Sequence, residues 1–375
     1  MKLIDRNDAV LEALPALSAS EWVAVDTEAD SLHHYVEKLC LLQLSVSGED
    51  FVFDTLADLN LGPVFEILSR KFLILHGADF DLRILKRTHD FLPLKIFDTM
   101  IAAQLLGYGK QGLADLAMKH CGVHLSKAAQ KADWSRRPLK EALVTYAAND
   151  THYLATIRRI MEEELQTLGR LPWHTQCCER LMQSVRIPRE DARRERPAWQ
   201  VKGAARLKGR ALTLLRELWH WREEKARTLD RPAFKVLNTE YLLQAAQWAS
   251  EHPGEDIGLM PDAPRNIRGE FREPLNTLLR EARVSPLAET VKTYRPVVSS
   301  PWTESSKKAF AALKVLRDSA GNELKIQPSL LATNAVLEIL ASKVPRSIQE
   351  IRGLDCLMPW QVEMLGEKIL EVTLD

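Results

Sequence analysis

Two carboxylates end an apolar run near the start of the chain: residues 22–25 are apolar, and Asp26, Thr27 and Glu28 follow them directly. In an extended strand, side chains two residues apart lie on the same face, roughly 7 Å apart along the backbone. Asp26 and Glu28 would therefore repel each other unless a cation lies between them. Carboxylate oxygens are typical ligands of hard divalent ions such as Mg²⁺ and Mn²⁺. Taken alone, the pair is more typical of an acidic strand end that faces water.

Three further residues are candidates for the same site. Asp81 lies near the start of a predicted helix, after an apolar segment at 72–75 that ends at His76. Tyr146 and Asp150 are four residues apart in a helix predicted over 139–168 and therefore share one of its faces. Each has an ordinary alternative role: Asp81 could balance a helix dipole, Tyr146 could be a half-buried packing residue, and Asp150 could face solvent.

The elements that position these residues predict an α/β fold. Strands are predicted at 22–28, 39–46 and 51–53, and their short connections are typical of an antiparallel meander. Two more short strands, 72–75 and 95–97, alternate with helices, which favours a mixed five-stranded sheet with helices on both faces. In such sheets, catalytic groups lie at strand ends and at the helix starts beside them.

In order and context, three segments resemble the three exonuclease motifs of the DEDD superfamily. They are Asp26-Thr27-Glu28, His76 to Asp81, and Tyr146 to Asp150. A tyrosine four residues before the last aspartate resembles the tyrosine subclass, which includes ribonuclease D and the proofreading domains of DNA polymerases. The resemblance implies that Asp26, Glu28, Asp81 and Asp150 are metal ligands.

Two other stretches resemble segments characteristic of the ribonuclease D family. The first is Asp98-Thr99, a predicted helix start, with Gln104 to Leu106, and the second is Lys127 to Leu139. The resemblance covers residues 1–170 and implies an RNase H-like fold for the predicted sheet. His76 and Gln43 lie near the motifs, and for both we expect a packing role.

The resemblance implies hydrolysis of phosphodiester bonds by two divalent ions, Mg²⁺ or Mn²⁺, about 3.5–4 Å apart. It implies that Asp26 bridges both ions, that Glu28 and Asp150 complete one, and that Asp81 holds the other through water. One ion would lower the pKa of the attacking water, and the other would stabilise the leaving 3′ oxygen. Because the ordinary pKa of tyrosine is near 10, we assign Tyr146 to orienting the water.

Charge is unevenly distributed along a chain whose formal net charge is zero. Residues 1–170 hold 19 Lys and Arg against 24 Asp and Glu, a net charge of −5, whereas residues 180–235 hold 16 against 7, a net charge of +9. An acidic front and a basic middle suggest a metal-dependent site beside a surface for polyanions. A solvated helical face would give the same run of charge.

The C-terminal half is helical in pattern and contains a weak internal repeat. Arg222 and Arg317 lie in similar contexts, as do Pro253 and Pro345. Both copies resemble HRDC domains, which are small all-α bundles associated with nucleic-acid binding. For the second copy, a helical domain without RNA contact is an equally open interpretation.

These patterns predict five parts in chain order. They are a 3′→5′ exonuclease domain at 1–170, a basic connecting segment at 171–207, a first HRDC domain at 208–287, a linker at 288–303 and a second HRDC-like domain at 304–375.

The remaining composition favours a cytoplasmic protein. The five cysteines include no C-x-x-C pair, which favours reduced thiols over a disulfide framework or a zinc site. The N-terminus has no long apolar segment, and no uncharged apolar run reaches membrane-spanning length. We expect a monomer that does not bind membranes.

We therefore expect a 3′→5′ exoribonuclease that releases 5′-mononucleotides. Its expected partner is structured RNA with a single-stranded 3′ end, such as a tRNA precursor, and the choice of tRNA rests on the resemblance alone. One alternative is a 3′→5′ DNA exonuclease, because the metal site would accept either sugar. A second alternative is a non-catalytic RNA-binding scaffold, against which the complete set of four acids speaks.

Overall fold

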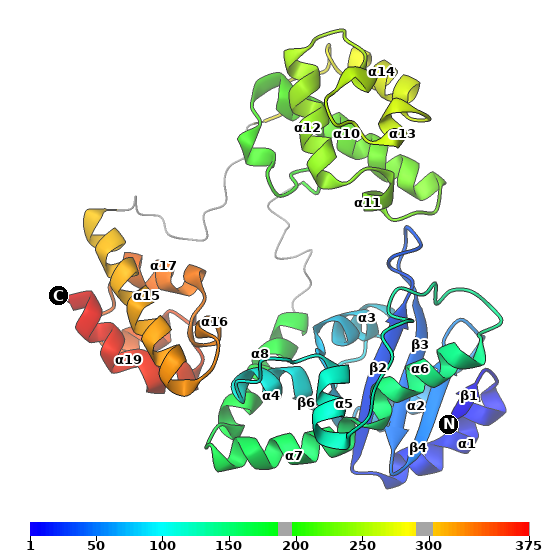
Figure 1. The fold of residues 1–375 in the computed structure, drawn as a ribbon, viewed down its shortest axis with the longest axis vertical. Helices are drawn as coiled ribbons and strands as arrows, with labels where there is room; N and C mark the ends of the chain where they lie inside the picture. The colour runs from blue at the N-terminus through cyan, green and yellow to red at the C-terminus, as the bar shows by residue number, and fades with distance from the viewer. Residues whose placement is uncertain (187–196, 290–302, 375) are drawn as a thin grey trace. The chain divides into compact units, whose positions relative to one another are not determined.

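The structure, a computed structural model, describes residues 1–186, 197–289 and 303–374 (Figure 1). The described residues fall into two compact units. The first lies within Met1–Ala29, Leu39–Ile187 and Arg295–Asp375, and the second within Asp30–Lys38 and Pro188–Tyr294. Most of the linker predicted at 288–303 and part of the connecting segment predicted at 171–207 lie outside the described residues. All five cysteines are free thiols, and none of the described helices is both long and apolar enough to span a bilayer.

A mixed sheet forms the centre of the first unit (Figure 1). Its strands are β1 (Lys2–Ile4), β2 (Trp22–Ala29), β3 (Leu39–Val46), β4 (Glu49–Asp54), β5 (Phe72–Leu75) and β6 (Lys95–Asp98), in the spatial order β1-β4-β3-β2-β5-β6. The predicted meander is present, because β2, β3 and β4 pair antiparallel. Strands β5 and β6 pair parallel beside β2, which makes the sheet mixed.

The sheet has six strands, one more than the five predicted. The additional strand, β1, is only three residues long and pairs parallel with the edge of β4. Three residues are too few to show the alternation by which a strand is recognised from sequence. The helix that follows it, α1 (Asn7–Ala19), was also not predicted.

Helices cover both faces of the sheet, as predicted. On one face lie α1, α2 (Gly62–Leu68), α3 (Asp79–His89) and α8 (Leu171–Arg186), which enclose the main hydrophobic core with the strands. On the other face α6 (Glu141–His152) lies over β2, β3 and β4, and α7 (Leu154–Thr167) lies beside β5 with α4 (Thr99–Leu105) and α5 (Leu113–Cys121) packed against it. The candidate acids of β2 face α6.

Two helical segments differ from the predicted ones. The single helix predicted over 139–168 is two helices, α6 and α7, which meet at Tyr153. The first part of the predicted connecting segment is the helix α8. Its Cys178, Met182 and Val185 are spaced to lie on one helical face and are buried in the main core. Polar residues separate these positions, which conceals the apolar stripe in the sequence.

Asp98, at the end of β6, connects three elements. Its carboxylate accepts two backbone N–H groups at the start of α4, at 2.8 and 3.2 Å, so the predicted helix start is confirmed. It also accepts the backbone N–H groups of Gly77 and Ala78, at 3.0 and 2.8 Å, in the turn between β5 and α3. The side chain is 1% exposed. Asp98 therefore fixes where α3 begins and, with it, the position of Asp81.

The C-terminal helices form two copies with the same order of elements. The first copy contains α10 (Gly209–Thr228), α11 (Ala233–Val236), α12 (Thr239–Glu251), α13 (Arg265–Arg268) and α14 (Arg272–Glu281), and the second contains α15 (Glu304–Leu324), α16 (Pro328–Leu331), α17 (Asn334–Lys343), α18 (Ile348–Gly353) and α19 (Pro359–Leu374). In each copy a buried arginine donates to a backbone carbonyl 15 residues later: Arg222 to Leu237 and Arg317 to Ala332, at 3.4 and 3.2 Å. The internal repeat predicted from the sequence is therefore present in the structure.

The second copy belongs to the same unit as the sheet. Trp173 of α8 stacks on Trp360 of α19, with ring centroids 4.5 Å apart. Arg170 donates to the Leu324 carbonyl at 2.8 Å. These contacts join α19 to α8, and α15 to the turn between α7 and α8.

The fold generates a prediction about Asp98. Asp98→Ala should lower the free energy of unfolding by about 2–4 kcal/mol, because it removes a helix cap and leaves two further backbone donors without an acceptor. Urea denaturation of the full chain measures this loss. Ser347→Ala is the control, since Ser347 caps α18 through one exposed bond at 3.2 Å, and its loss should be about 1 kcal/mol. Equal losses for the two variants would contradict the linking role of Asp98.

Candidate active site

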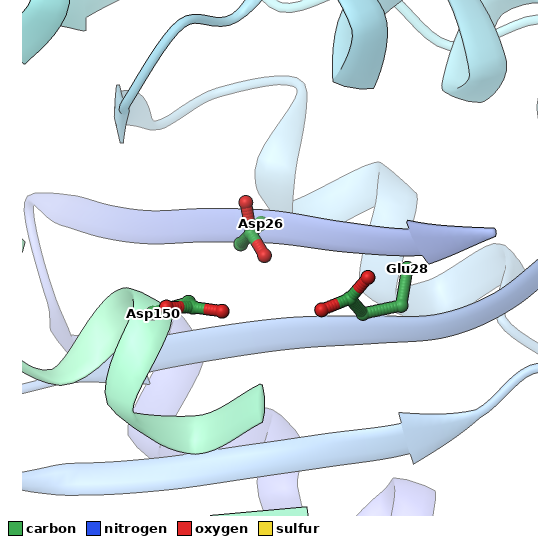
Figure 2. A group of neighbouring side chains, drawn as sticks. All are labelled: Asp26, Glu28 and Asp150. Carbon is green, nitrogen blue, oxygen red and sulfur yellow. The ribbon is translucent and has the colours of Figure 1, made fainter. Parts of the chain in front are cut away.

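Strand β2 and helix α6 bring three of the four predicted acids together. Figure 2 shows Asp26 and Glu28 on β2 with their carboxylates directed toward Asp150 of α6. One ligand oxygen from each of the three carboxylates lies within 4.8 Å of the others. All three side chains keep part of their surface open to solvent, so that water and ions can reach them.

Helix α6 can bring Asp150 close to β2 because the side chains on its inner face are small. Ala147 and Ala148 are 0% and 4% exposed and pack against β3 and β4, so the helix lies close to the sheet. Beside Asp150, the hydroxyls of Thr151 and Ser45 of β3 lie 2.7 Å apart and form a hydrogen bond. The register of α6 over the sheet, and hence the position of Asp150, is fixed by these contacts.

Asp81 reaches the site from the opposite face of β2. Thr27 lies between Asp26 and Glu28 and points to the face that α3 covers, where its Oγ1 donates to Asp81 Oδ1 at 2.5 Å. Asp81 is 5% exposed and is not one of the three clustered carboxylates. Thr27 was not among the residues predicted for the site, although the alternation of side chains along a strand places it opposite the acidic pair.

The carboxylates disfavour one another's charged forms. Burial, followed by the charges of Asp81, Asp150 and Glu28, raises the pKa of Asp26 well above its ordinary value. Burial and the charges of Asp150 and Asp81 raise the pKa of Glu28 to about 9. Burial raises the pKa of Asp150 to about 7 and that of Asp81 to about 6, with the Thr27 hydrogen bond opposing the rise at Asp81. A cation among these groups would reverse the effect, because it favours the ionised forms.

Tyr146 is linked directly to the cluster. Its hydroxyl and the Asp150 carboxylate form a hydrogen bond, and burial together with the nearby negative charges raises the pKa of Tyr146 above its ordinary value. The hydroxyl therefore keeps its proton at neutral pH. Its ring lies against Trp134, with centroids 6.0 Å apart.

A pocket of about 360 Å³ lies beside Tyr146 and Asp150. Its wall includes Ala128, Ala129 and Ala132, which come from the segment recognised as characteristic but given no role in the sequence analysis. The small side chains leave space, and the lining combines apolar walls with polar groups at the carboxylate end. Such a lining suits a flat ring attached to a charged backbone.

His76 lies outside the acidic cluster and contacts the start of α4. Its Nδ1 and the Thr99 hydroxyl, at the start of α4, form a hydrogen bond at 2.9 Å. Burial lowers the pKa of His76 below its ordinary value, so the ring is neutral at neutral pH. This contact agrees with the packing role expected from the sequence.

The donor set fits a divalent cation. Asp26, Glu28 and Asp150 supply hard oxygen ligands from two elements, and Asp81 adds negative charge from a third. Charged oxygen ligands that converge in this way are the environment that Mg²⁺ and Mn²⁺ prefer.

Family models match most of the chain. A 3′-5′ exonuclease model matches residues 1–166, and an HRDC domain model matches residues 211–255 and 306–373. The first match contains all of the candidate acids. The second covers α10 to α12 of the first helical copy and nearly all of the second copy.

Ribonuclease D proteins resemble the chain over most of their length. The protein from Xanthomonas oryzae pv. oryzae is 30% identical over 331 residues, which cover 85% of each chain. The protein from Bartonella henselae is 28% identical over 374 residues, 98% of this chain and 89% of its own. The crystal structure of Escherichia coli RNase D superposes with a TM-score of 0.70 at 25% identity and covers 99% of this chain and 98% of its own. The chain therefore belongs to the ribonuclease D family of 3′→5′ exoribonucleases.

Proposed function

We propose that the chain shortens structured RNA from its 3′ end by a two-metal-ion hydrolysis in which Asp26, Glu28, Asp81 and Asp150 hold the ions. The observation that carries this proposal is the convergence of three carboxylates from β2 and α6 within 4.8 Å. Asp81 is joined to the same strand by the Thr27 hydrogen bond. Cations placed among these partly buried acids would compensate their charge and favour the ionised forms.

The residues divide the work of the reaction. Bound divalent ions would supply an acidified water and stabilise the leaving 3′ oxygen. Asp26, at the centre of the cluster, would contact both ions, and Glu28 and Asp150 would complete one of them. The Tyr146 hydroxyl keeps its proton and donates a hydrogen bond to Asp150. Because it does not act as a base, we assign it to orienting the attacking water. The adjacent pocket of about 360 Å³ is suited to the terminal nucleotide.

Structured RNA, such as a tRNA precursor with a single-stranded 3′ end, is the proposed substrate. The E. coli relative is described as an exoribonuclease involved in structured RNA processing. An acidic site does not attract phosphates before ions fill it, so affinity for a long polyanion must come from another surface. Residues 180–235, with 16 basic and 7 acidic residues, and the first HRDC copy are the proposed surface. This assignment replaces the alternatives of a DNA exonuclease and a non-catalytic scaffold.

Asp26→Asn should reduce Mg²⁺-dependent release of mononucleotides from a 3′-extended tRNA below detection, because a neutral amide cannot replace a carboxylate between two cations. The same variant should raise the melting temperature of the metal-free protein. Raised pKa values mean that the folded chain holds protons that the unfolded chain releases. This stabilisation is complete below the ordinary pKa values and is lost as pH rises through about 6 for Asp81 and about 9 for Glu28.

The metal-free wild type should accordingly melt at a lower temperature near pH 9 than near pH 5, and Asp26→Asn should show a smaller fall. Asp58→Asn is the control, because Asp58 is exposed on the loop before α2, and it should change neither activity nor melting temperature. Near wild-type turnover of Asp26→Asn in Mg²⁺ would show that the site is wrongly assigned.

Tyr146→Phe should slow hydrolysis without abolishing it, by roughly 10²- to 10⁴-fold, the usual contribution of a positioned proton-transfer group. Single-turnover cleavage of an oligoribonucleotide labelled at its 5′ end measures the rate. Tyr153→Phe, at the junction of α6 and α7, is the matched control and should leave the rate unchanged. A loss of rate as large as that of Asp26→Asn would mean that the hydroxyl is essential for hydrolysis. An unchanged rate would mean that Tyr146 is only a packing residue.

Replacing Lys202, Arg206 and Lys208 together with alanine should weaken binding of structured RNA. These exposed residues precede α10 of the first HRDC copy. Each phosphate contact releases counterions, so the slope of log affinity against log salt should become shallower by roughly 2–3. Cleavage of a short single strand should be unchanged. An equal effect from alanine at Lys307, Lys308 and Lys314 of α15 would contradict an RNA surface centred on the first copy.

A further inference from the structure

Gln43, in the middle of β3, is a buried polar side chain without a partner. It is 0% exposed, and among the residues that the structure describes neither its Oε1 nor its Nε2 has a hydrogen-bond partner. A carboxamide offers one acceptor and two donor hydrogens. Buried side chains of this kind almost always have a partner, so a completely unpaired one needs an explanation.

The strand register places Gln43 against the acidic cluster. Gln43 and Asp26 are directly opposite each other in the antiparallel pairing of β3 with β2. Opposite residues point to the same face, with Cβ atoms about 4.5–5.5 Å apart. Ser45, two residues along on the same face, is hydrogen-bonded to Thr151 of α6. Gln43 therefore lies beneath α6, beside the carboxylate at the centre of the site.

A second buried glutamine in the same unit shows what a packing role looks like. Gln361 of α19 is 6% exposed. Its Oε1 accepts the backbone N–H of Met358 at 2.7 Å, and its Nε2 donates to the Leu330 carbonyl at 2.7 Å. Both halves of that amide hold backbone segments together. Gln43 holds no such segment, so the packing role expected for it from sequence does not account for its chemistry.

We propose that Gln43 is a positioning residue for Asp26, whose ionised carboxylate accepts a hydrogen bond from Gln43 Nε2 when the site holds a divalent cation. This inference rests on the proposed metal site. An amide suits the task because it is neutral: it orients a carboxylate oxygen without adding a positive charge that would compete with the cation. A lysine or arginine at this position would occupy the carboxylate itself.

Gln43→Met tests the inference, because methionine keeps the length of the side chain and removes its hydrogen bonds. In the full-length chain, Mn²⁺ affinity measured by titration calorimetry without RNA should fall about 10- to 100-fold, the usual effect of removing a group that orients a metal ligand. kcat on a short oligoribonucleotide should fall, with KM for the RNA unchanged. The melting temperature in the presence of a chelator should stay the same or rise, because no hydrogen bond of the metal-free protein is lost.

Gln361→Met is the matched control, with the opposite expectation: a lower melting temperature in chelator and an unchanged Mn²⁺ affinity. If Gln43→Met follows this control pattern, Gln43 is a packing residue and the inference is overturned. Asp26→Asn separates the two proposals. If it binds Mn²⁺ as tightly as the wild type, the metal site itself is misplaced. If it loses Mn²⁺ binding while Gln43→Met retains it, the metal site stands and only the role of Gln43 fails.

Discussion

Repulsion among four neighbouring carboxylates is the constraint on which the first unit depends. Burial, and after it the charge of the neighbouring acids, raises the pKa of Glu28 and of Asp150. Such a cluster would separate if its parts could move. The fold prevents this by placing two acids on a central strand and by fixing the helices that carry the other two. In the proposed metal site, this unfavourable charge would give the cluster its affinity for cations.

The groups that hold the cluster in place are neutral or small. Thr27 donates a hydroxyl to Asp81, and the alanines at 147 and 148 let α6 lie close to the sheet. Asp98 is charged, but its carboxylate accepts four backbone N–H groups at two helix starts, so its charge is held by backbone dipoles. A positively charged neighbour would relieve the repulsion without a metal. The surroundings therefore leave the repulsion for the proposed ions to compensate.

The division of charge along the chain follows from the same constraint. In the proposed function, a site that is negative before ions bind would not attract a long RNA, and the basic run at residues 180–235 would do so instead. The HRDC copies share a frame in which Arg222 and Arg317 are each used internally, to hold a carbonyl 15 residues away. Their exposed lysines and arginines remain for other contacts. Placing the acidic cluster and the basic run in different parts of the chain would allow each to keep the charge that its proposed role requires.

The sequence predicted the local elements and named the candidate acids. Alternation and helical spacing predicted five strands in their observed places, and Asp98 is the helix start it was expected to be. Local pattern could not reveal β1, which is too short, or the core role of α8, whose apolar positions are separated by polar residues. Only the tertiary structure decided how distant residues meet. Thr27 and Asp81 are 54 residues apart, and Gln43 faces Asp26 because β2 and β3 pair in one register. These contacts depend on strand pairing and helix packing across the whole fold. The local spacing of residues in the sequence does not reveal them.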